Sequence, residues 1–425
     1  MAAYMNRLHH ISLHVSNVDK VAQKLVSRFQ FNVFAARLTG RAKQLALRRG
    51  SAVFVVNERP SEPVDGPQSR AWSSVAARDH RDLRCLYGAH AHHPVDTVSN
   101  VCFEVECVER ASRALRDQGL CEFLQPPTEV RDARGRVCFS VLRSAVGNVC
   151  HTLIDCSRYR GPFLPGFSAV EPGSQTAERA HCPISHFDHI TYACPRGSTA
   201  LFTRWYQQNF GFQRFFIDRD EDEEQGFVLH HEGIGLRLTA MAFRSRRAVG
   251  ITRPCGEEDE PDCKLVFSES LPQQGSNQVD SFLDQHRGAG VQHIGLYTEN
   301  ILTTAHTLRL AGVQFYSPPP AYYTEVGKQQ EILDAGLDPH TLSRYGILLD
   351  TDVYSDSRIP PSQRLLLQVF TKPMFGENSF FLELIERRGA AGFGEGNIRA
   401  LWRSVQNEER EHRNTHTHTA DIRHD

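Results

Sequence analysis

Three residues in the C-terminal half have side chains suited to binding a metal ion. His189 lies in "FDHI", His293 in "VQHIG" and Glu383 in "FFLELIERR", and each of these runs predicts a β-strand. Two neutral imidazoles and one carboxylate can bind a divalent metal on one face, as in non-haem Fe(II) oxygenases. A carboxylate inside an apolar strand is costly to bury unless it is paired, and a cation would pair it. The three residues therefore predict a metal centre.

Each of the three residues also has an ordinary structural explanation. A single histidine in a strand is more often a hydrogen-bonded or half-exposed residue than a ligand, and Glu383 alone would fit a surface strand. The prediction of a metal site is stronger for the three residues together, because they occupy equivalent positions in repeated modules. The corresponding positions of the first half hold His10, Asn100 and Thr152, so only the second half presents the complete set.

The elements that position these residues form an internal repeat. Pairs of segments share the same plan in the same order: 8–32 with 187–212, 98–123 with 291–316, and 149–163 with 380–394. Each half then contains two strand–helix–strands modules, which predicts an α+β fold of four βαβββ units. Because side chains alternate between the faces of a strand, paired modules can curl into an open barrel with a lined interior.

The length of 425 residues exceeds one ordinary core, and the repeat divides the chain. We predict an N-terminal domain without a complete metal site at 1–165, a Pro/Gly/Ser-bearing linker at 166–182, a catalytic domain at 183–408 and a flexible His-rich tail at 409–425. The N-terminal domain is then expected to pack on the catalytic domain and to support contacts in a homodimer.

Composition excludes several classes of partner. The net charge of −2 provides no basic field for nucleic acid, and no apolar run is long enough to span a bilayer, so we expect neither a nucleic-acid partner nor an integral membrane protein. Eleven cysteines without CxxC pairs fit free thiols in a reducing compartment. The first 18 residues contain no acid, as in a mitochondrial presequence, although "LHHISLHV" equally fits a first strand.

Longer motifs resemble the 4-hydroxyphenylpyruvate dioxygenase family of the vicinal-oxygen-chelate superfamily. They are "FDHI", "GAGVQHIGLYTENI", "LLLQVFTKPMF" and "FFLELIERRGAAGFGEGNI", while "QLALRRGSAVFVVNE" and "YRGPFLPGF" resemble the vertebrate dioxygenase-like branch. The resemblance implies the vicinal-oxygen-chelate fold, with repeated βαβββ modules in two open barrels and a C-terminal lid helix. It also implies Fe(2+) as the cofactor, with His189, His293 and Glu383 as its ligands.

The same resemblance implies a substrate and a reaction. An aromatic 2-oxo acid would react with O2 by oxidative decarboxylation followed by hydroxylation of the remaining aryl-acetate. Attack on the benzylic carbon gives 4-hydroxymandelate, whereas attack on the ring gives homogentisate; a non-catalytic binding protein is a third reading. The vertebrate branch implies a mitochondrial location and a supply of ubiquinone headgroup, with a cytoplasmic location as the alternative.

Positions on the substrate side also follow from the resemblance. They are Gln278, Gln292, Gln368, Phe370, Phe381, Trp402, Ser268, Leu238 and Ile398. Strict strand alternation would place Gln292 on the face opposite to His293.

Three of the substrate-side positions depart from the dioxygenases. Ser268, Leu238 and Ile398 stand where those enzymes have Asn, Ser and Phe, and bacterial hydroxymandelate synthases also have an aliphatic residue at the last position. We therefore favour benzylic hydroxylation. Drift within an apolar helix face is the alternative, because Ile398, Leu401 and Trp402 follow helical spacing.

Overall fold

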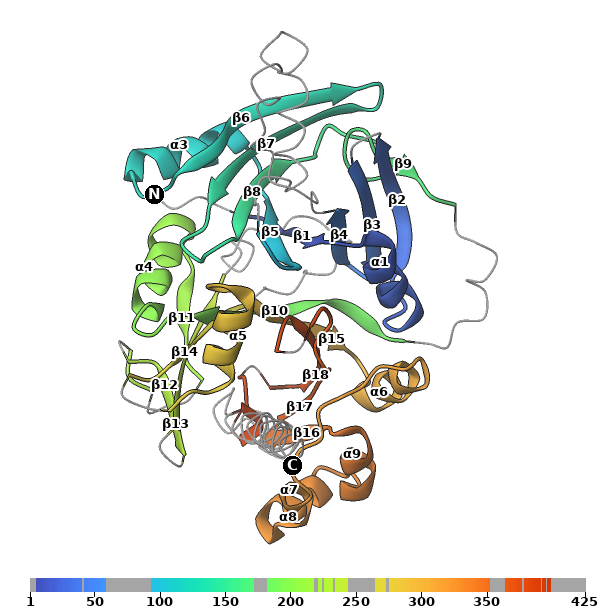
Figure 1. Ribbon diagram of the computed structural model, residues 1–425, viewed down its shortest axis with the longest axis vertical. Helices are drawn as coiled ribbons and strands as arrows, with labels where there is room; N and C mark the ends of the chain where they lie inside the picture. Colours follow the sequence, from blue (N-terminus) through green and yellow to red (C-terminus); the bar gives the residue numbers. More distant parts are fainter. Residues whose placement is uncertain are drawn as a thin grey trace, which may run out of the picture.

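Two nine-stranded sheets, one from each half of the sequence, form the computed structural model and lie one above the other along its long axis (Figure 1). The structure describes residues 5–39, 42–58, 93–171, 182–217, 221–223, 225–231, 234–243, 264–272, 275–351, 364–376, 378–390, 392–394 and 396–398. Trp402, most of the predicted lid helix and the tail at 409–425 lie outside the described residues.

The first sheet comes from the N-terminal half, in the order β6-β7-β8-β5-β1-β4-β3-β2-β9. Its elements are β1 (Arg7–Val15), α1 (Val18–Ser27), β2 (Asn32–Thr39), β3 (Ala42–Arg49), β4 (Ala52–Glu58), β5 (Thr97–Glu104), α3 (Val108–Gln118), β6 (Phe123–Asp132), β7 (Gly135–Arg143), β8 (Cys150–Asp155) and β9 (Ser168–Ala169). β1 and β5 pair antiparallel at its centre, flanked by parallel β4 and β8. Because β9 pairs with β2, part of the predicted linker belongs to this sheet.

The second sheet repeats this plan, in the order β11-β13-β14-β10-β15-β18-β17-β16, with β12 paired to β13. Its elements are β10 (Ile184–Cys194), α4 (Thr199–Phe210), β11 (Gln213–Phe215), β12 (Phe227–His231), β13 (Ile234–Ala242), β14 (Lys264–Ser270), α5 (Gln278–His286), β15 (Gly290–Thr298), α6 (Ile301–Leu310), α7 (Ala321–Thr324), α8 (Val326–Asp334), α9 (Pro339–Tyr345), β16 (Leu348–Thr351), β17 (Leu365–Phe370) and β18 (Phe381–Arg388). β10 and β15 pair antiparallel, flanked by parallel β14 and β18. The predicted α+β fold of repeated modules is confirmed.

One face of each central strand packs into a large core that joins the halves. In the second sheet, Ile190, Ile294 and Leu384 belong to this core, together with residues of α1, α3, α4 and α6. Because strand side chains alternate, the next residues along these strands point to the opposite, inner face of the sheet. The predicted metal ligands are therefore held on strands whose other face is anchored in the core.

Contacts between the halves are specific as well as apolar. The rings of Phe54 and Phe187 lie 5.0 Å apart. The hydroxyl of Tyr206 lies 3.0 Å from Ser144 Oγ and 2.8 Å from Nε2 of His151. A fully buried tyrosine hydroxyl needs such partners, so these bonds fix how the two sheets face each other.

Two helices, one in each half of the chain, begin after asparagine caps. The side chains of Asn17 and Asn300 accept hydrogen bonds from the backbone of the first turns of α1 and α6. Each cap satisfies a donor that a helix start leaves free, which fixes where the helix leaves the preceding strand.

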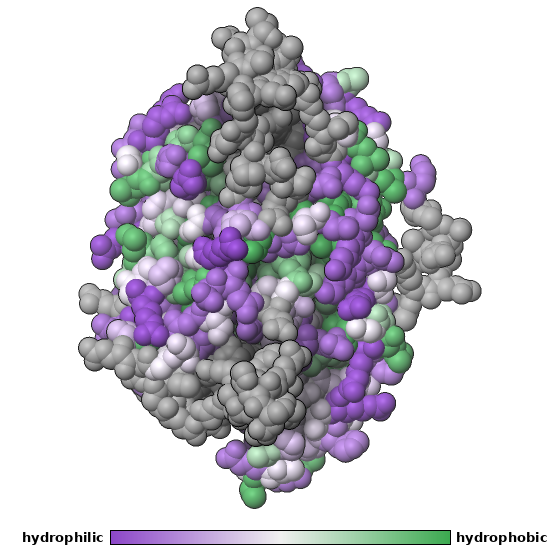
Figure 2. Space-filling model, viewed as in Figure 1, coloured by the Kyte–Doolittle hydropathy of each residue, from purple (hydrophilic) through white to green (hydrophobic). Residues whose placement is uncertain are grey.

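The surface is mixed in character. Hydrophilic and hydrophobic residues are interspersed on the face shown in Figure 2. Among the described residues, no helix combines the length and the hydrophobicity that crossing a membrane would require.

Candidate metal centre

The structure brings the three predicted ligands together. The donor atoms of His189, His293 and Glu383 all lie within 4.8 Å of one another, and all three side chains are buried. Oε2 of Glu383 lies 3.0 Å from Nε2 of His189 and 3.6 Å from Nε2 of His293. Strand pairing produces this proximity, because Gly295 of β15 pairs with His189 on one side and with Glu383 on the other.

The spacing of these atoms fits one divalent ion. With bonds of about 2.1 Å, two adjacent ligands of an octahedral metal lie about 3 Å apart, close to the observed separations. The nitrogen that faces the carboxylate is Nε2 in both histidines. A His–His–carboxylate set of this geometry leaves the remaining positions open for substrate.

Asp188 orients the first ligand from behind. Its Oδ1 lies 2.9 Å from Nδ1 of His189, so Nδ1 carries the proton and Nε2 is left for the metal. Arg387 binds the same carboxylate through two hydrogen bonds of 2.7 and 2.8 Å, and it also donates to the backbone oxygen of Gly392. Burial alone would raise the pKa of Asp188, but Arg387 outweighs it and holds that pKa well below its usual range.

The field at this position favours a positive charge. Burial alone would lower the pKa of His189, yet Glu383 and Asp188 outweigh it and raise that pKa to about 9. Burial and the neighbouring His189 hold the pKa of His293 well below its ordinary value. The carboxylates that would retain a proton on His189 would equally stabilise a metal cation in its place.

A chain of hydrogen bonds holds the carboxylate of Glu383. Nε2 of Gln368 donates to Oε1 of Glu383 at 2.8 Å, and Nδ2 of Asn397 donates to Oε1 of Gln368 at 2.9 Å. The Tyr322 hydroxyl donates to Oδ1 of Asn397 at 3.2 Å. Glu383 therefore turns its other oxygen, Oε2, towards the histidines.

Aromatic and aliphatic side chains flank the three ligands. Phe381 stacks on His293 with ring centroids 4.7 Å apart, and it shares an apolar cluster with Phe370. The rings of Phe393 and His189 meet in a T-shaped pair with centroids 5.4 Å apart, and Phe393 belongs to a second cluster that contains Leu238 and Ile398. The three ligands are buried against these clusters, and a charge interaction is stronger in a buried, low-dielectric site than in water.

Comparisons with known proteins agree with this centre. The model of the Glyoxalase/Bleomycin resistance protein/Dioxygenase superfamily matches residues 186–339. The "4-hydroxyphenylpyruvate dioxygenase-like protein" of Rattus norvegicus is 42% identical over 96% of this chain and 98% of its own length. The chain belongs to the 4-hydroxyphenylpyruvate dioxygenase family. Fe(II) is the cofactor of this family, as the sequence predicted, and the three side chains present suitable donors for it.

More distant relatives extend the likeness. The human "4-hydroxyphenylpyruvate dioxygenase-like protein" is 40% identical over 96% of this chain and 98% of its own length. The 4-hydroxyphenylpyruvate dioxygenase of Dictyostelium discoideum is 26% identical over 95% of this chain and 98% of its own. A solved mutant of 4-hydroxymandelate synthase from Streptomyces coelicolor matches with a TM-score of 0.69 at 22% identity, covering 96% of this chain and 99% of the other. That structure shows the same fold.

The remaining substrate-side positions of this dioxygenase vary in their surroundings. Ser268 pairs with Leu238 across β13 and β14, but its hydroxyl donates to the backbone oxygen of Tyr192 at 3.0 Å. Gln278 is the half-buried first residue of α5. Ser268 is thus already hydrogen-bonded to the chain, whereas the role of Gln278 stays a prediction.

Gln292 shows why strict alternation fails in this dioxygenase. The pairing of β10 with β15 shifts between Thr191↔His293 and Tyr192↔Val291, which leaves Gln292 as an extra residue. Such a β-bulge interrupts the alternation of side chains between the two faces. Because of this bulge, Gln292 need not face away from His293, and its contact with substrate stays a prediction.

Gly295 was missed by sequence reasoning, although the centre depends on it. A Cβ at this position would lie 2.4 Å from Cε1 of His189 and 2.5 Å from its Nδ1. Any side chain would push the imidazole out of place. The dioxygenase needs glycine here because the ring of the first ligand fills the space next to the β15 backbone.

Proposed function

We propose that this dioxygenase oxidatively decarboxylates 4-hydroxyphenylpyruvate and hydroxylates its benzylic carbon, giving 4-hydroxymandelate. The observation that carries the proposal is the place of Ile398, which packs half-buried in the apolar cluster of Leu238 and Phe393. Phe393 in turn contacts His189. An aliphatic side chain thus stands close to the metal centre, at a position that matches an aromatic ring in the dioxygenases that form homogentisate.

The residues of the chain bind, orient and exclude water. Fe(II), when bound, would supply the centre at which the 2-oxo acid and O2 react. His189, His293 and Glu383 would hold it on one side, while Asp188 and Gln368 keep two of these ligands in orientation. The Phe381 cluster and the Ile398 cluster would enclose the aromatic part of the substrate.

The shape of the pocket decides which carbon is hydroxylated. A phenylalanine at position 398 would offer a flat face or edge against which the substrate ring could pack. A branched isoleucine offers a different shape and lacks this aromatic contact, so the ring would sit differently and present the benzylic carbon. Leu238 extends the same aliphatic wall.

The test is product identification after anaerobic reconstitution with Fe(II), followed by addition of 4-hydroxyphenylpyruvate and O2. We expect 4-hydroxymandelate from the wild type, a shift towards homogentisate in Ile398→Phe, and unchanged product in the matched control Ile398→Leu. His293→Ala should form no product. Homogentisate as the main wild-type product would contradict the proposal while leaving the metal centre intact.

The second candidate is a 4-hydroxyphenylpyruvate dioxygenase that forms homogentisate in tyrosine catabolism. More distant relatives carry that dioxygenase name, at 26 to 28% identity over most of the chain.

The third candidate function is that of a non-catalytic binding protein on the same scaffold. Iron content separates it from the other two, because correctly folded chain without Fe(II) after anaerobic loading would favour it.

We also propose that the enzyme acts as a homodimer in mitochondria and supplies the aromatic headgroup of ubiquinone. This setting rests on the resemblance to the vertebrate dioxygenase-like branch, with a cytoplasmic location as the alternative. In cells that lack the protein, added 4-hydroxymandelate should restore ubiquinone, and homogentisate should not. If neither compound restored ubiquinone, the proposed role in ubiquinone synthesis would be contradicted, but the proposed reaction would not.

A further inference from the structure

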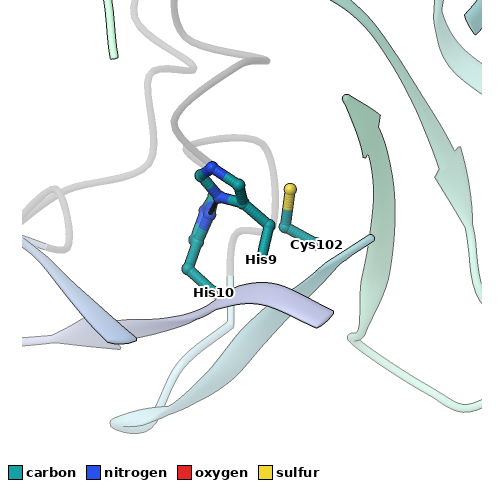
Figure 3. Close-up of side chains that lie close together, drawn as sticks. All are labelled: His9, His10 and Cys102. Carbon is teal, nitrogen blue, oxygen red and sulfur yellow. Dashed lines mark hydrogen bonds between the residues drawn. The ribbon is translucent and has the colours of Figure 1, made fainter. Parts of the chain in front are cut away.

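A second group of metal-binding side chains lies in the N-terminal half, far from the iron centre in the sequence. His9 and His10 of β1 and Cys102 of β5 place one donor atom each within 4.8 Å of one another. Figure 3 shows both imidazole rings on the same side of β1, next to the sulfur of Cys102. His10 and Cys102 are fully buried, and His9 is half-buried.

A β-bulge explains how two consecutive residues share one side of a strand. Leu8 pairs with Phe103 and His10 with Cys102, which leaves His9 as the extra residue of β1. The bulge interrupts alternation and lets neighbouring side chains point the same way. Nδ1 of His9 consequently lies 2.7 Å from Nδ1 of His10.

The repeat places this group where the iron centre lies in the other half. His10 pairs with Cys102 as His189 pairs with Gly295, and Cys102 pairs with Thr152 as Gly295 pairs with Glu383. His10 therefore corresponds to His189, and Cys102 to Gly295. The thiol of Cys102 thus lies beside the one imidazole that both halves have in common.

Two of the iron-ligand positions are occupied differently in this half. Thr152 and Asn100 stand where the other half has Glu383 and His293, and the Thr152 hydroxyl donates to Oδ1 of Asn100 at 3.1 Å. This hydrogen bond engages the Thr152 hydroxyl and the Asn100 carbonyl oxygen, and neither side chain is an anionic ligand. The only acidic donor of the group is the Cys102 thiol.

We propose that His9, His10 and Cys102 bind a Zn2+ ion. Imidazole nitrogens and a cysteine sulfur are the donors that zinc prefers, at about 2.0–2.1 and 2.3 Å. Ligands of a tetrahedral ion at these bond lengths lie roughly 3.3–3.8 Å apart. The donor atoms of the group all lie within 4.8 Å of one another, and the two Nδ1 atoms, now 2.7 Å apart, would have to separate to admit the ion. Binding would replace the thiol proton with the metal and release that proton to solvent.

The surroundings suit a structural zinc ion. Phe163 stacks on His9 at 5.7 Å and meets His10 edge-on at 5.5 Å, which covers the two rings. The sulfur of Cys156 lies 3.9 Å from Nε2 of His9, on the edge of the ring that faces away from His10, so Cys156 belongs to the surroundings of this ring and not to the ligand set.

The alternative is a hydrogen-bonded histidine pair beside an inert buried thiol. Both readings place the same side chains together, but only the zinc site binds a metal through sulfur. The iron centre has no sulfur ligand, so a sulfur-specific signal distinguishes the N-terminal site from the iron centre. Cobalt(II) gives that signal, because its thiolate complexes absorb strongly by charge transfer from sulfur to metal.

The experiment adds Co2+ anaerobically to the chelator-treated full chain and records the thiolate charge-transfer absorption. We expect this absorption to saturate at one site per chain, to disappear on addition of Zn2+, and to persist in His293→Ala. It should be lost in Cys102→Ser and retained in the matched control Cys194→Ser, which changes a fully buried cysteine of the other half. Circular dichroism verifies folding, and His9→Gln replaces Cys102→Ser if that variant does not fold.

Two results would overturn the proposal. One is a wild-type chain that binds Co2+ without thiolate absorption. The other is absorption that survives in the folded Cys102→Ser or His9→Gln variant, since it would then come from another cysteine of the chain. The proposed dioxygenase reaction is not involved in either result.

Discussion

The two halves of the chain use the same β-bulge for different chemistry. In β10 the extra residue is Asp188, whose carboxylate fixes the proton of His189 on Nδ1. In β1 the extra residue is His9, whose ring lies against His10. The backbone thus presets where two neighbouring side chains meet, and the residue types decide what they bind.

A second difference lies across the strand from the shared histidine. Gly295 leaves room for the ring of His189, whereas Cys102 fills the corresponding place beside His10. In the second half the space is needed because a carboxylate from β18 approaches the same imidazole. In the first half Thr152 takes the place of that carboxylate, and a thiol can occupy the space instead.

The largest effect is expected from filling the space at position 295. In Gly295→Ala the new Cβ would lie 2.4 Å from the His189 ring, so the first ligand must move. A misplacement of about 1 Å at a reacting centre can cost roughly 100-fold in rate, and we expect at least that loss together with a loss of bound iron.

Iron per chain and the rate of product formation measure this effect. Gly327→Ala is the matched control, because nothing lies within 4 Å of a Cβ at that position. A Gly295→Ala enzyme with full iron and normal turnover would show that the glycine is not what separates the two halves.

The next largest effect is expected from the bulge residue of the second half. Asp188→Asn keeps an oxygen for Nδ1 of His189 but removes the charge that faces both this ring and Arg387. Loss of a partner behind a metal ligand typically costs about 10–100-fold in metal affinity or activity. Competition with a chelator gives the iron affinity.

The matched control for this change is Asp19→Asn, which removes the acid of an exposed pair with Lys43. Exposed ion pairs contribute little, so iron affinity should not change. Equal losses in both variants would mean that Asp188 acts through overall stability and not on His189.

The sequence predicted what depends on residue type and repeat order. His189, His293 and Glu383 were found because imidazole and carboxylate side chains are unusual in apolar strands and recur at matching places. Strand alternation then placed them correctly on one face, away from the core residues Ile190 and Ile294. Such information is local, and the strand geometry is regular at these positions.

What the sequence could not predict depends on irregular geometry or on distant contacts. The bulges at His9, Asp188 and Gln292 break alternation, and no residue pattern marks them. Asn397 reaches Gln368 from a segment 29 residues away, so its role appears only in three dimensions. Gly295 has no side chain to suggest a function.

A smaller effect is expected at the hydrogen-bond chain behind Glu383. Asn397→Ala removes the donor that holds Gln368, which in turn donates to Glu383. One hydrogen bond contributes about 0.5–1.5 kcal/mol, so turnover should fall roughly two- to twelvefold while iron remains bound. Steady-state kinetics of the iron-loaded enzyme measure the change.

Asn209→Ala is the matched control, because Asn209 is equally buried and donates to a backbone oxygen, that of Trp205 in α4. It should lower stability without changing turnover of the folded enzyme. Unchanged turnover in Asn397→Ala would mean that Gln368 holds Glu383 without help.

The smallest effect on catalysis is expected at the position that corresponds to Glu383 in the first half. Thr152→Val removes the hydrogen bond to Asn100 and leaves that buried amide with one partner fewer. The free energy of unfolding should fall by about 1–3 kcal/mol, measured by denaturant titration, with iron content and turnover unchanged. Asn100→Leu together with Thr152→Val should recover much of the loss, because replacing both partners by apolar groups is nearly neutral. If Thr152→Val alone emptied the iron centre, the first half would contribute to catalysis directly, and the separation of roles between the halves would be wrong.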